Sequence, residues 1–262
     1  MDSLIQTMDL VGHHVYHYRC VGSTNKVARL LARQKACGGT VVVADEQLHG
    51  EGRRGNHWHS PFGGLWFSLI LDSPEKRESM FIYPLLAATA VAEVLTRDYG
   101  CPASLSWPND VVVRGRKICG VMCKTWAGSG SPSYGILGVG LNLNNKVFPS
   151  HLGATATSLS MITGIEVAPL VFLESLLPLI DCLNDLARSN QSSLVARLQE
   201  SLPYVGSLVN LRSSDGDRVV RLMGIDERGC LIIVSETGQK QHIGPQELVS
   251  VMPLEKAITK SR

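Results

Sequence analysis

The chain has 262 residues, of which 44% are hydrophobic and 18% charged, a balance typical of a folded globular protein and not of a disordered one. Its formal net charge of +2 gives no broad positive field for a polyanion, so we do not expect nucleic acid as a partner. The start MDSLIQTMDL lacks the pattern of a signal peptide, and no stretch reaches the roughly 18 uninterrupted apolar residues of a spanning helix. We therefore expect a cytoplasmic protein without a membrane partner.

Hydrophobic periodicity predicts a first region in which strands alternate with helices. Ser23 or Thr24 is suited to cap the first helix, and Gly100 to end the second. The turn signals between the strands favour a mainly antiparallel or mixed sheet, and the fold class is therefore α+β. The expected elements are, in chain order, a strand at 13–20, a helix at 25–36, strands at 39–47 and 65–71, a helix at 84–100, a hairpin within 104–126, a strand at 133–144, and helices near 168–188 and 191–202.

After Pro203 the sequence changes to short β-rich runs that are separated by glycine turns. Closely spaced strands without a helical pattern predict a small β-barrel of about 50 residues. We therefore divide the chain into a large domain at 1–204 and a small barrel domain at 205–262. The five predicted strands of the barrel lie within 207–212, 217–226, 230–236, 240–244 and 247–252.

The seven cysteines are an odd number and include no C-x-x-C pair, so we expect reduced thiols. Cys119 and Cys123 are close together on one predicted strand, but a zinc site would need two more ligands nearby. Small buried side chains are the better interpretation. The histidines between 13 and 17 and at 57 and 59 also lack a metal-binding spacing, and we assign them no metal.

The segment GEGRRG at 50–55 has the glycine spacing G-x-G-x-x-G of a dinucleotide-binding loop. In that motif the glycines lead into a helix whose N-terminus faces a pyrophosphate. Here Pro61 and Gly64 exclude a helix, which disfavours a nucleotide-dependent oxidoreductase. The sequence instead predicts a mobile loop in which Arg53 and Arg54 can grip a phosphate as the loop closes, although an isolated G-R-R-G is more often a solvated surface loop.

Several motifs recur in one order over nearly the whole chain and together resemble the biotin protein ligases. They are S-T-N at 23–25, GEGRRG with NHW and SPFGG after it, WPND at 107–110, RKICGVMCK at 116–124, GVGLNLNN at 138–145 and FPSHLGATATSL at 148–159. The resemblance implies a class II synthetase-like catalytic domain followed by an SH3-like barrel. Only 22 residues precede Ser23, too few for the helix-turn-helix that some members carry, so we expect a ligase that does not bind DNA.

The resemblance also implies a two-step reaction. Biotin's carboxylate attacks the α-phosphate of Mg-ATP to give biotinyl-5′-AMP, and a lysine amine of a biotin carboxyl carrier domain then displaces AMP. Biotin and ATP are thus the expected substrates and Mg²⁺ the expected metal. The sequence leaves open which carboxylase supplies the acceptor, and whether two chains pair as a homodimer.

Site residues follow from the resemblance, position by position. The expected catalytic groups are Lys117, Arg53 and Asp110, with Asp110 also a ligand of the Mg²⁺ that enters with ATP. The expected biotin-binding residues are Ser23, Thr24, Asn25, Gln47, Gly50, Gly52, Arg53, Trp58, Lys117 and Gly120. The expected ATP- or adenylate-binding residues are Arg53, Arg54, Gly55, Trp58, Asn109, Lys117, Asn142 and Asn144.

Some of these residues have an ordinary structural alternative. S-T-N could serve only as a helix cap, and Trp58 could belong to the core. A lysine at the start of a strand is more often solvated than catalytic, although alternation places Lys117 on the opposite face from Ile118.

The chain departs from the family pattern at two positions. Glu51 stands where arginine is usual, and Ser106 precedes WPND where lysine is common. A carboxylate about 4 Å from a phosphate charge would cost on the order of 4 kcal/mol at an effective dielectric near 20. We therefore expect Glu51 to turn outward or to pair with Arg54, and the adenylate to be held less tightly than in the family at large.

Two other functions compete with a biotin ligase. A lipoate-type ligase shares the fold and the chemistry, but its loop usually resembles R-R-G-G-G-x-x-x-H, whereas this loop reads R-R-G-N-H-W. The two departures also leave room for a catalytically weak protein that only binds biotin.

Overall fold

The structure is a computed structural model that describes residues 3–71, 81–126, 134–213 and 216–254. Its largest element is an eight-stranded sheet with the strand order β1-β2-β3-β4-β8-β7-β6-β5. Neighbouring strands are antiparallel except β2 and β3, which are parallel. The strands are β1 (Leu4–Leu10), β2 (His13–Val21), β3 (Val41–Gln47), β4 (Leu65–Leu71), β5 (Ala103–Ser106), β6 (Asp110–Val113), β7 (Arg116–Trp126) and β8 (Tyr134–Leu141).

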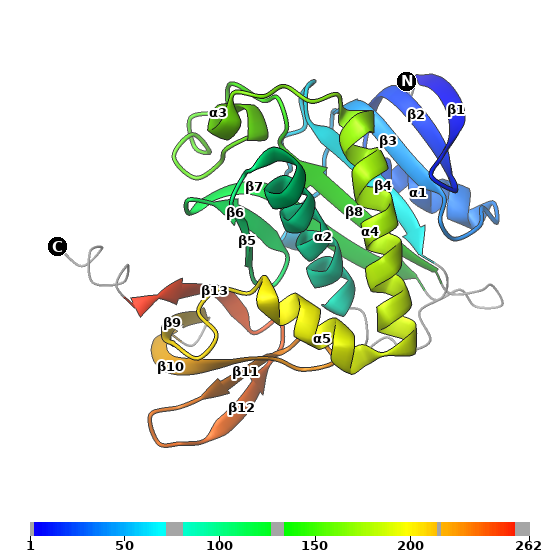
Figure 1. Cartoon of the computed structure of the whole chain (residues 1–262). Helices are drawn as coiled ribbons and strands as arrows, with labels where there is room; N and C mark the ends of the chain where they lie inside the picture. Colours follow the sequence, from blue (N-terminus) through cyan, green and yellow to red (C-terminus); the bar gives the residue numbers. More distant parts are fainter. Residues whose placement is uncertain (1–2, 72–80, 127–133, 214–215, 255–262) are drawn as a thin grey trace.

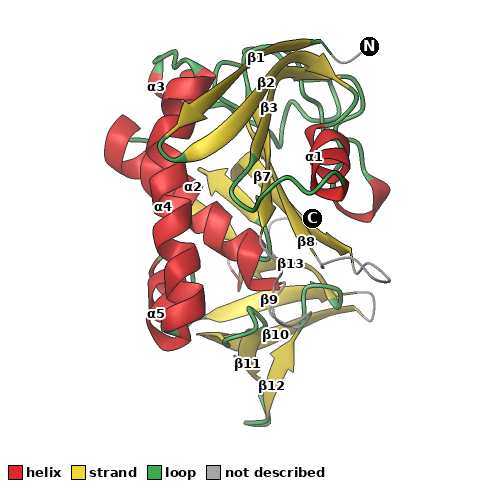
Figure 2. Ribbon diagram, turned by 90° about the vertical axis from the view of Figure 1, so that its right-hand side faces the viewer, coloured by secondary structure: helices red, strands yellow, loops and turns green. Residues whose placement is uncertain are grey.

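Helices cover both faces of this sheet (Figures 1 and 2). One face carries α2, α4 and α5, and the opposite face carries α1, which connects the parallel strands β2 and β3. Double cover explains why every residue of β4 is buried, since alternate side chains point into two separate cores. The helices are α1 (Thr24–Arg33), α2 (Ile82–Tyr99), α3 (Leu159–Thr163), α4 (Pro169–Ser189) and α5 (Gln191–Glu200), with a short 3₁₀ helix η1 (Arg53–Gly55).

The predicted α+β class and the mainly antiparallel sheet are confirmed. Four features were not predicted: strand β1, whose side chains are mostly exposed, the five-residue helix α3, the short 3₁₀ helix η1, and the division of the first arm of the hairpin at 104–126 into β5 and β6. The helix expected at 84–100 begins at Ile82, two residues before Pro84, and ends at Gly100 in the left-handed conformation (φ 60°). Among the described residues, no helix is both long and apolar enough to cross a membrane.

The C-terminal segment forms a second, five-stranded antiparallel sheet below the first in Figure 1. We call it the C-terminal sheet, and its strand order is β12-β11-β10-β9-β13. No pairing of β12 with β13 closes this sheet among the described residues, so the SH3-like barrel and the division of the chain at 204/205 remain predictions. The strands are β9 (Leu208–Ser213), β10 (Gly216–Ile225), β11 (Leu231–Val234), β12 (Lys240–Ile243) and β13 (Leu248–Pro253).

The two sheets meet at the WPND segment. The indole Nε1 of Trp107 donates to the carbonyl of Gly229 at 3.0 Å, and this contact is buried. A Cβ at Gly229 would lie 3.1 Å from Leu85 and from the carbonyl of Phe81, so the turn before β11 fits tightly against α2. The C-terminal sheet thus packs directly behind a segment that the sequence assigns to the site.

Candidate active site

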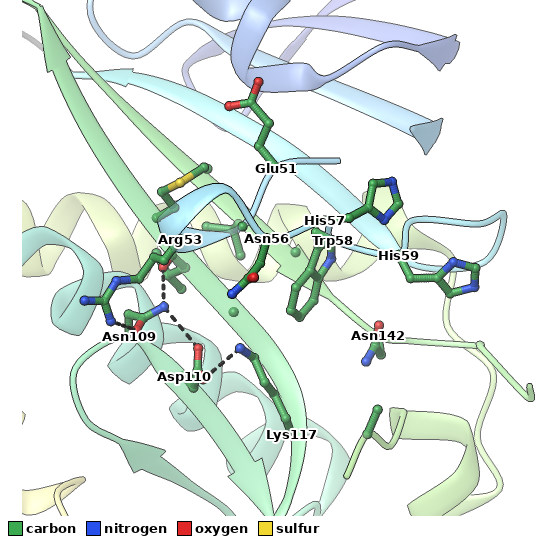
Figure 3. A pocket seen from close by; sticks show the side chains of 18 of the residues that line it. Glu51, Arg53, Asn56, His57, Trp58, His59, Asn109, Asp110, Lys117 and Asn142 are labelled. Carbon is green, nitrogen blue, oxygen red and sulfur yellow. Dashed lines mark hydrogen bonds and ion pairs between the residues drawn. The ribbon is translucent and has the colours of Figure 1, made fainter. Parts of the chain in front are cut away.

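A cavity of about 660 Å³ lies over the face of the large sheet that carries α1 (Figure 3). This volume is in the range of sites that enclose a small molecule. The cavity has a neutral polar end and a charged end, and the loop at 50–58, the arginine loop, also lines it. Predicted site residues that line the cavity are Thr24, Asn25, Gln47, Gly52, Arg53, Arg54, Trp58, Asn109, Asp110, Lys117, Gly120 and Asn142.

The neutral end consists of hydrogen-bonded side chains at the start of α1 and the end of β3. The Gln47 Oε1 accepts from the Thr24 backbone N–H at 2.8 Å and from the Thr24 hydroxyl at 3.1 Å. The Gln47 Nε2 donates to the Ser60 hydroxyl at 2.8 Å. The Ser68 hydroxyl of β4 donates to the Thr24 hydroxyl at 2.8 Å and lies 3.2 Å from the Asn25 Oδ1. We call Thr24, Asn25, Gln47, Ser60 and Ser68 the neutral end; the first three line the cavity, and the buried Ser60 and Ser68 support them through these hydrogen bonds.

Ser23 occupies the N-cap position of α1, but its side chain makes no capping hydrogen bond. The predicted N-cap position is therefore confirmed, but this hydroxyl does not cap the helix. The Ser23 Oγ is buried and has no hydrogen-bond partner among the described residues. Ser68 was missed by the sequence analysis, because a serine within the apolar run LWFSLIL carries no signal of its contacts.

Glycines on β7 and β8 form the floor of the cavity. A Cβ at Gly138 would lie 2.6 Å from both polar atoms of the Asn25 amide, and one at Gly140 would overlap the Trp58 indole. A Cβ at Gly120 would also come within 2.9 Å of that indole. Only glycine lets these side chains lie so close to the sheet. The sequence analysis singled out Gly120 and overlooked the alternating Gly138 and Gly140.

The arginine loop turns back on itself. Its arms are joined by hydrogen bonds from the Gly52 N–H to the Asn56 carbonyl at 2.7 Å and from the Trp58 N–H to the Gly50 carbonyl at 2.8 Å. Arg54 and Gly55 at the tip have φ of 56° and 79°. No α-helix follows the loop before β4, as predicted, so the geometry of a dinucleotide-binding turn is absent from this described segment.

The charged end is a chain of contacts between groups that are far apart in the sequence (Figure 3). The Arg53 Nη1 donates to the Asn109 Oδ1 at 2.7 Å, and the Asn109 Nδ2 donates to the Asp110 Oδ1 at 3.0 Å. The Asp110 Oδ2 pairs with the Lys117 Nζ at 2.7 Å. We call Arg53, Asn109, Asp110 and Lys117 the charged end.

Burial and neighbouring charges act on these groups in opposite directions. Burial raises the pKa of the Asp110 carboxyl, and the attraction of Lys117 and Arg53 offsets only part of that effect. Burial, together with the adjacent Arg54, lowers the pKa of the Arg53 guanidinium, while Asp110 acts against this shift. The cations are thus concentrated where water is partly excluded, and such placement strengthens their interaction with an anion.

Lys117 is fixed by its backbone as well as by Asp110. Its N–H donates to the Thr155 carbonyl at 2.7 Å, and its carbonyl accepts from the Thr157 N–H at 2.9 Å. The Nζ lies 5.0 Å from the centre of the Trp58 ring, a cation–π distance. Lys117 therefore faces the cavity, whereas Ile118 points into the core, as the alternation predicts.

Trp58 crosses the cavity between its two ends. It covers the glycine floor and contacts the Lys117 ammonium, so it is part of the cavity wall and not of the hydrophobic core. Its Nε1 is buried and has no hydrogen-bond partner among the described residues.

Four predicted site residues do not line the cavity: Ser23, Gly50, Gly55 and Asn144. Gly50 packs against the Trp58 carbonyl and the Ser60 hydroxyl, which supports the base of the loop. Asn144 makes two hydrogen bonds with the backbone of Val167, at 2.8 and 3.0 Å, and so braces the chain after β8. Their roles in ligand binding stay predictions.

Asn142 lies at the far side of the cavity, where its Nδ2 donates to the Thr157 carbonyl at 3.0 Å. Three histidines that were not predicted as site residues also line the cavity: His57, His59 and His151. Burial, followed by repulsion from the other two histidines, lowers the pKa of His59. His57 and His59 adjoin the arginine loop, but a pair of histidines in a loop is too common to have indicated this position.

Glu51 does point outward from the charged end, as one of our alternatives expected (Figure 3). Its partners, however, are the Lys124 Nζ at 2.7 Å and the Lys26 Nζ at 3.7 Å. Arg54 instead donates to the Gln246 carbonyl at 3.3 Å. The expected pairing of Glu51 with Arg54 was therefore wrong. Ser106 lies opposite Asp110 in the β5–β6 pair and is not among the residues that line the cavity.

The described residues contain no group of three histidine, cysteine or acidic side chains that could hold a metal ion. Burial raises the thiol pKa of both Cys119 and Cys123, to about 12 for Cys123, as expected for small apolar side chains. Asp110 is the acidic residue next to the cavity cations, and both of its oxygens already have partners.

Comparison with known proteins gives one consistent family. Residues 18–142 match the model of the biotin/lipoate A/B protein ligase family. The bifunctional ligase/repressor BirA of Bacillus subtilis is 31% identical over 239 residues, which cover 89% of this chain and 73% of that protein. A biotin–[acetyl-CoA-carboxylase] ligase of Paracoccus denitrificans is 34% identical over 163 residues, which cover 60% of this chain and 67% of that protein.

Solved structures agree. The biotin protein ligase of Aquifex aeolicus in complex with biotin and ATP superposes with a TM-score of 0.77 at 30% identity, covering 91% of this chain and 98% of that chain. The same ligase in its apo form superposes with a TM-score of 0.72 at 28% identity.

Proposed function

Because this chain belongs to the biotin protein ligase family, we propose that it activates biotin with Mg-ATP to biotinyl-5′-AMP and transfers the biotinyl group to a lysine of a biotin carboxyl carrier domain. The observation that carries the proposal is the convergence of Arg53, Asn109, Asp110 and Lys117 on one end of a cavity whose other end is neutral and polar. Biotin has the same asymmetry, with a neutral ureido ring at one end and a carboxylate at the other.

The neutral end is suited to the ureido ring. Thr24 offers a hydroxyl to the cavity, and Gln47 and Asn25 offer both an amide donor and an amide acceptor, while the buried Ser68 hydroxyl donates to Thr24 from behind. These groups already bond to one another, so their orientation is set before a ligand enters. The Trp58 ring, which lies against the glycine floor, supplies a flat surface against which the rings of the ligand can pack.

The charged end is suited to the reaction itself. In the first step a carboxylate oxygen attacks the α-phosphorus, a new C–O–P bridge forms, and the bond to pyrophosphate breaks. Negative charge builds up on oxygens beside the reacting atoms, where the Lys117 ammonium and the Arg53 guanidinium can stabilise it by about 3 to 4 kcal/mol each. In the second step an acceptor amine attacks the carbonyl carbon of the mixed anhydride and an amide bond forms. The C–O bond to the phosphate breaks, AMP leaves with the bond electrons, and the amine loses a proton to solvent.

Adenosine would then lie toward Asn142 and Trp58, which both line the cavity. Arg54 and Gly55 would reach it only through the arginine loop, and their contact with the adenylate stays part of the proposal. Mg²⁺ would enter with the triphosphate. Asp110 would be the residue that holds it, since its carboxylate faces the cavity and keeps lone pairs beyond those that accept from Lys117 and Asn109.

The test is to incubate the protein with biotin, Mg-ATP and a biotin carboxyl carrier domain and to measure the mass of the acceptor. We expect a covalent increase equal to one biotinyl group, and little or none with Lys117→Ala. Pyrophosphate exchange with biotin or lipoate as the acid separates the two ligase types, since the family model covers both. A parent protein that binds biotin but gives neither exchange nor transfer would be the catalytically weak binder instead.

The remaining partner proposals concern nucleic acid and self-association. The net charge of +2 favours a protein without DNA binding, although the Bacillus relative is named a ligase/repressor. Gel mobility with DNA and sedimentation with and without biotin and ATP would test DNA binding and homodimer formation separately.

A further inference from the structure

The arginine loop is fastened to the rest of the molecule on two sides. On one side the Arg53 Nη2 donates to the Pro245 carbonyl at 2.9 Å and the Arg54 Nη2 to the Gln246 carbonyl at 3.3 Å, both in the C-terminal sheet's β12–β13 connection. On the other side Glu51 contacts Lys124 and Lys26.

Glu51 sits where movement of the loop would begin. It follows Gly50 at the base of the loop and forms a β-bridge with His57 on the returning arm. The ion pairs of its carboxylate therefore fix both arms of the loop: the outgoing arm, to which Glu51 itself belongs, and the returning arm, which the β-bridge joins to it. The tip, with Arg54 and Gly55, is exposed beyond this point.

The two lysines belong to elements that carry opposite ends of the cavity. Lys124 is on β7, the strand that carries Lys117 of the charged end at its second position. Lys26 is on α1, whose first residues Thr24 and Asn25 belong to the neutral end. Burial acts against the charge of Glu51, but hydrogen bonding and attraction by the lysines outweigh it, so the pKa of this carboxyl is lowered and the group stays ionised.

We propose that Glu51, paired with Lys124 and Lys26, is a positioning residue that holds the arginine loop over the cavity and slows the release of the bound adenylate. The adenylate part of this inference rests on the proposed function. The chain carries a carboxylate where the family resemblance expects arginine, and this carboxylate makes the two ion pairs. Removing Glu51 would loosen retention further instead of restoring it.

Limited trypsin digestion measures the position of the loop without any ligand, because Arg53 and Arg54 are themselves cleavage sites. We compare the parent with Glu51→Gln, Lys124→Met and Lys124→Arg. The matched control is Lys146→Met, which breaks an exposed ion pair outside the loop. In that pair the Lys146 Nζ lies 2.7 Å from the Glu166 Oε1. Cleavage after Arg53 or Arg54, identified by mass, should be about two- to five-fold faster in Glu51→Gln and Lys124→Met, as expected for loss of partly exposed ion pairs.

Three further results are expected if the carboxylate acts through its partner. Lys124→Arg should cleave at the parent rate, since arginine keeps the ion pair. The double variant of Glu51→Gln and Lys124→Met should cleave no faster than the faster single variant. Salt at about 1 M, where the screening length is about 3 Å, should raise cleavage of the parent toward that of the variants.

Release of the radiolabelled adenylate from the parent and the variants is the second readout, with an expected increase of about two- to five-fold. If the parent forms no adenylate, the proposed function fails, while the digestion still tests the fastening. If Glu51→Gln and Lys124→Met digest and release adenylate at the rates of Lys146→Met, the fastening is overturned. The fastening is also overturned if Glu51→Gln changes the digestion and release rates but Lys124→Met leaves both at the parent values.

Discussion

The neutral end of the cavity is made mainly by three adjoining elements, whereas the charged end is assembled from three segments that are separate in the sequence and it contacts the C-terminal sheet. Thr24, Gln47 and Ser68 lie at the start of α1, at the end of β3 and within β4, which pack side by side. Arg53, by contrast, donates both to Asn109 and to the carbonyl of Pro245, which lies 192 residues after Arg53 in the chain.

This difference indicates how each end can fail. Neutral hydrogen bonds between packed elements orient a ligand but stabilise charge only weakly, so their loss should affect binding. The charged end concentrates two cations around one carboxylate, so its loss should affect the chemical step. Because its contacts reach the second sheet, the charged end should also respond to changes made far from the cavity.

The largest effect is expected at Lys117. Lys117→Ala removes the cation at the reacting atoms and should lower kcat for adenylate formation by about 10²–10³-fold. It also leaves Asp110 without its partner, which should lower the free energy of unfolding by about 1–3 kcal/mol.

A second variant separates these two consequences. Adding Asp110→Asn to Lys117→Ala should restore most of the stability, measured by urea unfolding, while the rate stays low. If the double variant regained the rate of adenylate formation, Lys117 would not be the group that supplies the catalytic charge.

Gln47→Ala should produce the next largest effect, this time on binding. The Gln47 amide joins Thr24 to Ser60, so its removal leaves polar groups unpaired and should raise KM for biotin by about ten-fold or more, with kcat changed much less. Initial rates over a range of biotin concentrations provide the measurement. Glu46→Ala, at the exposed neighbouring position of β3, is the control. A fall in kcat with KM unchanged would contradict the division of the cavity into two ends.

Gly138→Ala tests whether the glycine floor supports the neutral end. Its Cβ would lie 2.6 Å from the Asn25 amide, and β4 and β7 hold the strand on both sides, so Asn25 must shift. We expect a loss of about 1–3 kcal/mol in unfolding free energy together with weaker biotin binding, measured by urea unfolding and calorimetry.

Gly135→Ala on the same strand is the matched control, because its Cβ would make only an ordinary contact with Leu71 at 3.4 Å. Equal effects of the two alanines would mean that the strand itself, and not the approach of Asn25, sets the requirement for glycine.

The smallest effect concerns Asp226, which orders the turn before β11. Its Oδ1 accepts from the Arg228 and Cys230 N–H groups, each at 2.9 Å, and this turn holds the Gly229 carbonyl that receives the Trp107 indole. Burial raises the pKa of Asp226, but its contacts with His242 and the backbone outweigh this, and the net pKa is lowered.

A lowered carboxyl pKa means that the stabilisation is complete above the unfolded-state pKa and is lost as pH falls through the lower folded-state pKa. Asp226→Asn should therefore cost less than about 1 kcal/mol at neutral pH, and its difference from the parent should shrink below about pH 4. Thermal unfolding at several pH values tests this. If the stability difference between Asp226→Asn and the parent grew as the pH fell, the folded-state pKa of Asp226 would be raised and not lowered.

Local patterns in the sequence were sufficient for most of the fold. Alternating or helical periodicity located most strands from β2 onward and the long helices, because each buries a regular stripe of apolar residues, but it merged β5 and β6 into one run. Strand β1 escaped detection because its side chains are mostly exposed, and α3 because five residues give too short a period to recognise.

For the site, the sequence by itself determined which residue types are present and in what order: the S-T-N start of α1, the arginines of the loop, WPND and Lys117. The tertiary structure decided their partners. Glu51 pairs with Lys124 and Lys26 instead of Arg54, Ser68 joins the neutral end, and Gly138 and Gly140 admit Asn25 and Trp58. Periodicity reports which face of an element a side chain occupies, but not which distant segment packs against that face, because that depends on how all the elements pack together.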